Sequence, residues 1–139
     1  MRFVTRNHIH VDRIATAWAI RRFVDPESTF EFVPRNRDVS QLDAIPFDVR
    51  GAELGHHAGR CTFEALIAKY ELSEPGLGRM AAIIRAADVP YEDDAPGEAA
   101  GVAAIFDGLR DAETSDEDRL ARGMLICDAL YMFCKGAEA

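Results

Sequence analysis

Alternating apolar residues predict two β-strands near the start of the chain, with a helix between them. Arg2–Arg6 and Thr29–Val33 both alternate, and the second segment is rich in aromatic and β-branched residues. Asp12–Val24 has helical periodicity; its acidic first residue suits a helix N-terminus, and the Asp25–Pro26 pair ends it. A strand, a helix and a second strand at this spacing predict a parallel βαβ unit with a right-handed crossover.

A third short strand and a series of helices complete the predicted fold. The strand is Phe47–Val49, and Thr62 is placed to cap a helix that runs to about Tyr70. Three further helices are predicted, one beginning at Ser73–Pro75 and the others spanning Glu98–Leu109 and Asp116–Lys135. The predicted fold class is therefore α+β, with a small N-terminal sheet of about three strands packed with four to five α-helices. The C-terminal half is predominantly helical, and residues 1–139 are expected to form a single domain.

Size and composition are typical of a soluble globular domain. The 139 residues suffice for one hydrophobic core, and 48% hydrophobic with 29% charged residues is an ordinary balance. No apolar run approaches the roughly 20 residues of a membrane span, and the first residues do not resemble a signal peptide. The three cysteines form an odd set, which favours reduced thiols and a cytoplasmic location without membrane contact.

Charge is distributed unevenly along the chain. The formal net charge of −8 disfavours autonomous nucleic-acid binding, which depends on a basic face. Arginines nevertheless make the segment before Asp38 basic, whereas Glu92–Asp118 is strongly acidic. An anion, if one binds, is therefore expected at the N-terminal half.

The densest group of reactive side chains lies in the segment Gly51–Phe63. It holds Glu53, His56 and His57, and its glycines let the backbone approach a ligand closely. Adjacent histidines in a loop are able to face one site, and with the carboxylate they form a ligand set for a divalent metal such as Zn, Mn or Fe. The pattern matches no standard metal signature. The structural alternative is that one histidine caps the following helix and the other is solvated.

Cys61 and Arg60 stand just before the helix predicted at Thr62. A helix N-terminus and an adjacent guanidinium both lower a thiol pKa, which would make Cys61 a reactive thiolate or a metal ligand. A small buried cysteine is the more frequent outcome, and we favour it here. Arg60 is also a candidate contact for an oxyanion such as chromate.

The first helix carries Trp18 together with several arginines. Arg21 and Arg22 neighbour the indole, where arginine stacking is expected, and both are candidate anion contacts. Arg13 lies on the inner side of the same helix, which indicates either a buried acidic partner or a place in a site. Asp128 interrupts an apolar helical run, where an unpaired buried carboxylate would be very costly. We therefore predict that Asp128 is buried and bonded to a cationic or histidine side chain, with Arg13 as the best candidate.

Asp88, His8 and His10 are weaker candidates for site residues, and two further cysteines are expected in the core. Asp88, near the end of a predicted helix, is a weaker candidate acid. His8 and His10 alternate just before the first helix and so share one side of the chain, although a polar loop is the default there. Cys127 and Cys134 lie seven residues apart on the apolar face of the last helix and are expected in the core.

Several of these stretches together resemble the C-terminal domain of the ChrB family of chromate-resistance proteins, including its stand-alone forms. The matching stretches run in order over nearly the whole chain: VDRIATAWAIRRFVDPES (Val11–Ser28), FEFVP (Phe30–Pro34), PFDVRGAELGHHAGRCTF (Pro46–Phe63), EAAGVAAI (Glu98–Ile105) and CDALY (Cys127–Tyr131). The residues at family-like positions are Asp12, Arg13, Trp18, Arg21, Arg22, Asp25, Glu53, His56, His57 and Asp128.

The resemblance also limits the function. Many family members have Cys-Pro or Ser/Thr-Pro where this sequence has Thr16–Ala17, so a thiol-based role at that position is not expected. Full-length regulators of the family carry a long N-terminal region before this domain, which the resemblance implies is the DNA-contacting part. Together with the acidic charge, this implies that the chain alone does not act as a DNA-binding repressor.

Three functions are compatible with these features. The leading interpretation is a small cytoplasmic domain that binds a metal ion or a small oxyanion such as chromate and is associated with chromate or oxidative-stress resistance. The first alternative is a metal-dependent redox or detoxifying enzyme that uses the same His/Glu loop. The second is a non-catalytic regulatory interaction module in which the histidines are incidental. A homodimer is compatible with each of them.

Overall fold

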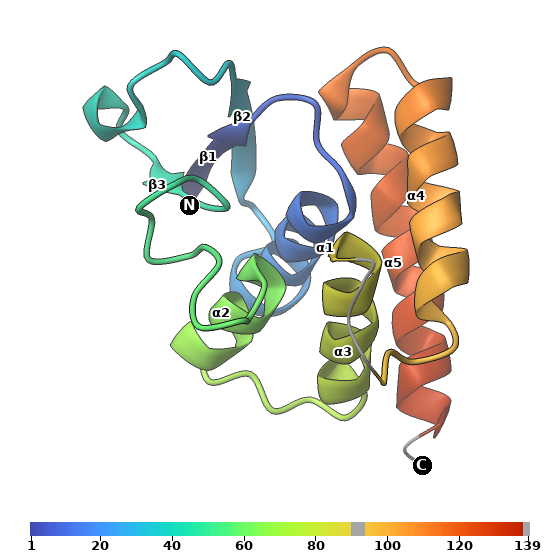
Figure 1. The fold of residues 1–139 in the computed structure, drawn as a ribbon. Helices are drawn as coiled ribbons and strands as arrows, with labels where there is room; N and C mark the ends of the chain where they lie inside the picture. The colour runs from blue at the N-terminus through green and yellow to red at the C-terminus, as the bar shows by residue number, and fades with distance from the viewer. Residues whose placement is uncertain (90–93, 138–139) are drawn as a thin grey trace.

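The computed structural model describes residues 1–89 and 94–137, and in these residues a three-stranded sheet lies beside five α-helices (Figure 1). The strands are β1 (Arg2–Arg6), β2 (Thr29–Val33) and β3 (Ile45–Pro46). The α-helices are α1 (Val11–Ala19), α2 (Thr62–Lys69), α3 (Leu77–Asp88), α4 (Ala99–Ala112) and α5 (Asp116–Ala137). A π-helical segment, η1 (Ile20–Val24), continues α1, and a short 3₁₀ turn, η2 (Val39–Gln41), precedes β3. The predicted α+β class is confirmed.

The sheet has the order β2-β1-β3, and both neighbours pair with β1 in parallel. A parallel pair needs a crossover connection, which α1 and η1 supply between β1 and β2 as the predicted βαβ unit. All three strands therefore end at one edge of the sheet. The segments that follow β1 and β3 meet there, at the place where open α/β sheets generally bind ligands.

The third strand lies earlier than the sequence predicts. A strand is predicted at Phe47–Val49, but β3 already ends at Pro46. Asp48 has a left-handed backbone with φ of 49°, which does not fit a β-strand. The Phe47 N–H still donates to the Val4 carbonyl oxygen at 3.0 Å, and Phe47 forms an isolated bridge to Leu54. The chain then turns into the loop that leads to α2.

The predicted helices are present, with some shifted ends. α3 begins at Leu77 after a left-handed Gly76, slightly later than predicted. α2 begins at Thr62, but its N-cap is Cys61, so the prediction that Thr62 caps this helix is wrong. The Cys61 N–H donates to the Glu64 carboxylate at 3.1 Å, which completes a capping box.

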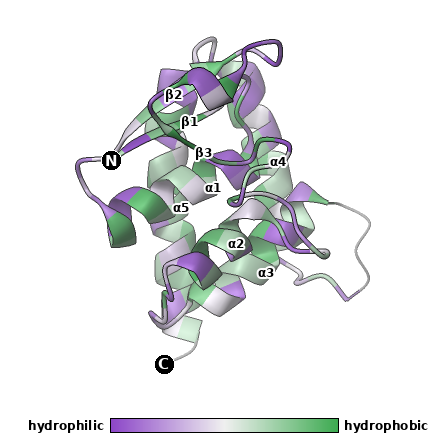
Figure 2. Cartoon of the chain, turned by 90° about the vertical axis from the view of Figure 1, so that its left-hand side faces the viewer, coloured by the Kyte–Doolittle hydropathy of each residue, from purple (hydrophilic) through white to green (hydrophobic). Residues whose placement is uncertain are grey.

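Helix α1 forms the centre of the core. Eight of its nine residues are buried, and it packs against α5, α2 and α3 while the sheet lies beyond it (Figure 1). Figure 2 shows hydrophobic segments of these helices grouped in the centre of the molecule. Cys127 and Cys134 are fully buried, as predicted. Within the described residues, no helix combines the length and the apolar character needed to cross a bilayer.

Candidate metal centre

Three acidic side chains from separate elements converge near the carboxyl edge of the sheet. Asp12 is in the first turn of α1, just after β1, and Asp48 follows β3 by two residues. Asp88 is the last residue of α3. His56 reaches these acids from the loop between β3 and α2. The sheet order and the packing of α1 against α3 therefore create a cluster that is scattered along the sequence.

The imidazole of His56 is the point at which the three carboxylates meet. Its Nε2 atom lies 3.1 Å from Asp12 Oδ2, 3.4 Å from Asp48 Oδ1 and 3.5 Å from Asp88 Oδ2. One ligand atom each from Asp12, Asp48 and His56 lie within 4.8 Å of one another. The His56 side chain is 47% exposed whereas that of Asp12 is 2% exposed. Asp12 therefore forms the buried side of the cluster, and His56 forms the side that is open to solvent.

Asp12 is fixed by the first turn of α2. Its Oδ2 accepts the N–H of Thr62 and its Oδ1 accepts the N–H of Phe63, both at 3.0 Å. These backbone N–H groups at a helix N-terminus lack partners within the helix, and the helix dipole favours a negative charge beside them. The buried charge of Asp12 is thus stabilised, and one of its oxygens still faces His56.

Asp48 is held by three contacts, one with Thr62 and two with Arg13. The Thr62 hydroxyl donates to Asp48 Oδ1 at 3.0 Å, and Arg13 Nε lies 3.0 Å from Asp48 Oδ2. The Arg13 guanidinium also donates to the Asp48 carbonyl oxygen at 3.2 Å. Arg13 therefore pairs with Asp48, and the prediction that it pairs with Asp128 is wrong. The left-handed backbone of Asp48 directs its carboxylate into the cluster, a kind of local strain that is common at functional sites.

The crowded charges shift the pKa values of the cluster. The hydrogen bond to Asp12 raises the pKa of His56 to about 9; burial opposes this rise, and the charges of the three carboxylates add to it. Burial raises the pKa of Asp88 to about 6, and burial also raises the pKa of Asp48. The charge of Asp12 acts in the same direction on both acids. At neutral pH the imidazole is accordingly an imidazolium cation among carboxylates.

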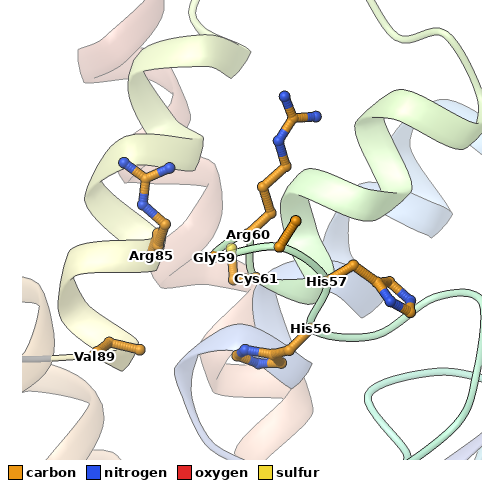
Figure 3. A pocket seen from close by; sticks show the side chains of 8 residues that line it. His56, His57, Gly59, Arg60, Cys61, Arg85 and Val89 are labelled. Carbon is orange, nitrogen blue, oxygen red and sulfur yellow. The ribbon is translucent and has the colours of Figure 1, made fainter.

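The structure does not bring Glu53, His56 and His57 together. His57 Nε2 lies 3.1 Å from the Ala52 carbonyl oxygen and 2.9 Å from that of Glu53, so this ring closes the loop. The Glu53 carboxylate instead pairs with Lys69 at 2.7 Å. The two imidazoles point away from each other (Figure 3). Of the predicted trio, only His56 faces the acidic cluster.

A tight turn explains why the adjacent histidines separate. His57 and Arg60 exchange two backbone hydrogen bonds, at 3.2 and 2.9 Å. The residues between them, Ala58 and Gly59, have φ values of 51° and 79°. Positive φ at both central positions is the pattern of a type I′ turn, which begins at His57 and directs its side chain away from that of His56.

A pocket of about 340 Å³ opens beside His56, and Cys61, Arg60, Arg85 and Val89 help to line it (Figure 3). Cys61 is 1% exposed, and burial raises the pKa of its thiol far above the usual range. A buried, protonated cysteine is the reading that the sequence favours, and the reactive thiolate is not supported. Arg85 pairs with Glu64 at 2.9 Å.

Away from the cluster, Trp18 of α1 and Asp128 of α5 form a hydrogen bond that joins the two helices. The Trp18 indole donates to Asp128 Oδ1 at 2.8 Å, and Arg22 lies 3.2 Å from the same oxygen. The Asp128 side chain is 49% exposed, so the cationic partner is confirmed and the predicted burial is wrong. Position 128 lies at the margin of the helix contact rather than inside it. The expected stacking is confirmed for Arg22, whose guanidinium carbon lies 5.8 Å from the Trp18 ring centre.

Of two other residues predicted as candidates, His10 lies near the cluster and Arg21 lies away from it. His10 helps to line a pocket of about 270 Å³ with the three acids, and its Nε2 lies 2.8 Å from Asp107 of α4. Arg21 donates to the Ser28 carbonyl oxygen at 3.1 Å and stacks over Phe30, which places it away from His56.

From the sequence, Asp12 was predicted only at a helix end, Asp88 was a weak candidate acid, and Asp48 was not predicted as a site residue. A signal for two of them was available. Asp12 and Asp48 each follow a parallel strand closely, and carboxyl ends of parallel strands share one edge. No comparable signal marks Asp88, which reaches the cluster through the packing of α3 against α1.

Comparisons with known proteins agree with the resemblance seen in the sequence. A family model described as "ChrB, C-terminal domain" matches residues 3–134. "Protein ChrB" of Cupriavidus metallidurans is 39% identical over 132 residues, which cover 93% of this chain and 39% of that protein. The chain thus spans well under half the length of this relative. No solved structure matches the chain significantly.

Proposed function

We propose that this chain, which belongs to the family of ChrB C-terminal domains, binds a divalent metal ion with Asp12, Asp48 and His56. Membership of this family associates the chain with chromate resistance. In this proposal, the domain contributes to chromate resistance by binding the metal ion. Asp88 is a further acid at the side of the centre.

The observation that carries the proposal is the spacing of the donor atoms. Two neighbouring donors bound to one ion at about 2.0 to 2.2 Å are separated by about 2.8 to 3.6 Å in octahedral or tetrahedral geometry. His56 Nε2 lies 3.1 Å from Asp12 Oδ2 and 3.4 Å from Asp48 Oδ1. His56 therefore lies at ligand-set separations from Asp12 and Asp48, and the donor atoms of these two acids lie within 4.8 Å of each other. A small adjustment of His56 would open the central position for an ion.

The charge balance supports a divalent cation. Three carboxylates with the Arg13 guanidinium leave two negative charges, which a divalent ion balances when the imidazole is neutral. The contacts of Asp12 with two backbone N–H groups and of Asp48 with Thr62 and Arg13 orient the ligands, as second-layer partners do in metal sites. Without metal, the imidazolium supplies part of the missing positive charge.

The donor types favour Mn²⁺ or Fe²⁺, with Zn²⁺ as the competitor. Carboxylate oxygens suit harder cations such as manganese, whereas an imidazole suits iron and zinc. A set of thiolates would have favoured zinc, but the Cys61 thiol is buried and protonated. An oxyanion at this cluster is disfavoured because three carboxylates face the same point.

A catalytic role is the second candidate, and the open side of the cluster favours it. Structural metal sites are closed by four protein ligands, whereas catalytic sites have three and leave a position for water or substrate. Here His56 is half exposed and three pockets border it. The half-exposed imidazole makes a metal-dependent redox or hydrolytic enzyme the alternative to simple binding.

Isothermal titration of protein treated with a chelator and dialysed tests the proposal, with Mn²⁺, Fe²⁺ (without oxygen), Zn²⁺ and chromate in separate runs. We expect at least one metal to bind with a Kd below about 0.1 mM. His56→Ala and Asp48→Asn should each weaken binding by about tenfold or more. The control Glu53→Gln changes an exposed carboxylate that faces Lys69 and should leave binding unchanged. Binding of chromate alone, or of no metal more tightly than about 1 mM, would contradict the proposal.

A further inference from the structure

A second pocket lies at the same edge of the sheet, on the β1–β2 side. It has a volume of about 420 Å³, and most of its lining side chains are basic. The residues that line it are Arg6, Asn7, His8, Arg13, Pro34 and Arg35. We propose that this pocket binds a multiply charged oxyanion of the phosphate class, either free or as the end group of a phosphate ester. This inference goes beyond the proposed metal binding and does not depend on it.

The guanidinium groups of Arg6 and Arg35 form no ion pair with a carboxylate of the described residues. The same holds for His8 within the described part of the chain. A group of unpaired cations inside a concave surface attracts anions because the field of each adds to that of the others.

Arg6 is oriented before any ligand arrives. One terminal nitrogen donates to the carbonyl oxygens of Pro34 at 2.9 Å and Arg37 at 2.8 Å. The guanidinium is thereby fixed across the ends of β1 and β2, and its other N–H groups have no hydrogen-bond acceptor within the part of the chain that the structure describes. A guanidinium held in this way loses little side-chain entropy when it binds two oxygens of a planar or tetrahedral anion.

The acids closest to the pocket are already engaged. Asp48 pairs with Arg13, and Asp116 lies 3.1 Å from Arg119. Asp116 also accepts the backbone N–H groups of His8 and Ile9, both at 2.9 Å. Asp38 accepts the N–H and the hydroxyl of Ser40, and these hydrogen bonds, followed by the charges of Arg37 and Arg6, lower its pKa. Asp38 therefore offsets part of the charge of Arg6 at longer range, and the charge of Arg35 remains available to a ligand.

The position of the pocket relative to the metal centre gives the ligand class further support. Arg13 lines both the basic pocket and the pocket that contains the three acids. The two pockets are therefore neighbours along the carboxyl edge, with opposite charge preferences. Such an edge is where parallel sheets commonly bind phosphate-bearing ligands. A free oxyanion would use the basic pocket alone, and an ester would extend from it toward Arg13.

The test is titration of metal-free protein in chelator, at constant ionic strength set with sodium chloride, with inorganic phosphate and with glycerol 3-phosphate. Both ligands should bind, and Arg35→Gln should weaken binding by about tenfold, because a charge-assisted hydrogen bond is lost. Arg35 is exposed, so this variant is expected to fold normally. The matched control is Arg60→Gln, which removes the same charge at the pocket beside His57 and should leave affinity unchanged.

Amide chemical shifts during the same titration locate the ligand. Shifts concentrated at Asn7, His8 and Arg35 support the assignment; tighter binding of glycerol 3-phosphate would then indicate an ester, and equal binding a free oxyanion. Equal affinity of Arg35→Gln and wild type would overturn the proposal, and so would shifts centred on Arg60 or the absence of binding below about 10 mM. Failure of metal binding would leave this result unaffected, because no metal is present.

Discussion

Asp12 combines two roles that usually fall to separate residues. Its oxygens accept the first two N–H groups of α2, and one of them also faces His56 at 3.1 Å. The carboxylate therefore joins α1 to α2 and at the same time forms the buried side of the cluster. An unsatisfied N–H group at a buried helix end is costly, so the fold constrains this residue independently of any ligand.

Replacement of Asp12 by Asn should destabilise the protein even without metal. The amide has only one acceptor oxygen, so one N–H of Thr62 or Phe63 faces the NH₂ group, and the ion pair with His56 is lost. We expect the free energy of unfolding to fall by about 3 kcal/mol. Urea unfolding followed by circular dichroism measures this loss. The control Asp43→Asn changes an exposed acid and should alter stability by less than about 0.5 kcal/mol; equal midpoints for Asp12→Asn and Asp43→Asn would refute the capping role.

His56 should make stability depend on pH in a defined direction. Its pKa is about 9 in the folded protein, whereas an unfolded histidine has a pKa of about 6.5. The folded state therefore keeps a proton that the unfolded state has lost, and stability decreases as pH rises through this range. The stabilisation is complete below about 6.5 and is lost as pH rises through about 9. In chelator, the difference in unfolding free energy between wild type and His56→Ala should shrink over this window, and a difference that does not change with pH would contradict the assignment.

The same proton should compete with metal. A metal ligand must be a neutral imidazole, so each metal ion that binds displaces the His56 proton at neutral pH. Metal affinity should therefore rise between about pH 6.5 and 9, a higher window than an ordinary histidine would give. Proton release can be measured by titration in buffers of different ionisation enthalpy. Constant affinity over this range would mean that His56 is not a ligand.

At the scale of the elements, the close contact of α1 with α5 sets the position of the site. Gly123 of α5 faces Ile14 of α1, and a Cβ atom at Gly123 would lie 2.4 Å from Ile14 Cγ2. The absence of a side chain lets the two helices approach closely. Helix α1 in turn carries Asp12 and Arg13, so a shift of this contact would move two residues of the cluster.

Gly123→Ala should therefore destabilise the protein by about 1 to 3 kcal/mol, since the methyl group overpacks a full core. Gly108 of α4 is a matched control because a Cβ there would meet nothing within 4 Å. Gly108→Ala should stabilise by about 0.5 to 1 kcal/mol through the helix propensity of alanine. The two variants should shift the urea midpoint in opposite directions. The same direction of change for both would show that the α1–α5 contact is looser than described.

At this scale the sequence predicted most of the fold and only part of the site. Helical and alternating periodicity identified β1, α1 and β2, since each depends on local pattern. The strand at Phe47–Val49 was displaced because Asp48 adopts a left-handed backbone that hydrophobic patterning does not reveal. His56 and His57 look equivalent in sequence, and only the turn at Ala58 separates them. The cluster depends on long-range packing, which pattern alone does not encode.

At the scale of the whole molecule, acidic and basic side chains form separate groups along one edge of the sheet. The acidic cluster lies on the β3 side, and the basic pocket lies on the β2 side, with Arg13 between them. A small edge with both signs suits a ligand of limited size better than the long phosphate backbone of DNA. The net charge of −8 acts in the same direction.

The chain by itself should therefore not bind DNA specifically. A gel-shift assay with the promoter region of its own operon, at physiological salt, should show no saturable retardation. Competition with unrelated DNA provides the control for weak nonspecific binding. Sequence-specific retardation by the isolated chain would contradict this prediction and would require a basic surface elsewhere.

The metal centre itself is tested most directly by a crystal structure of the protein grown or soaked with Mn²⁺, with anomalous scattering used to locate the ion. We expect one anomalous peak bonded to Asp12, Asp48 and His56, at about 2.0 to 2.3 Å from each donor atom. Asp88 should lie beside the peak, and the peak should be absent from crystals of His56→Ala. A fully occupied manganese peak elsewhere, or no peak while His56 remains within hydrogen-bonding distance of Asp12, would show that these residues do not form a metal site.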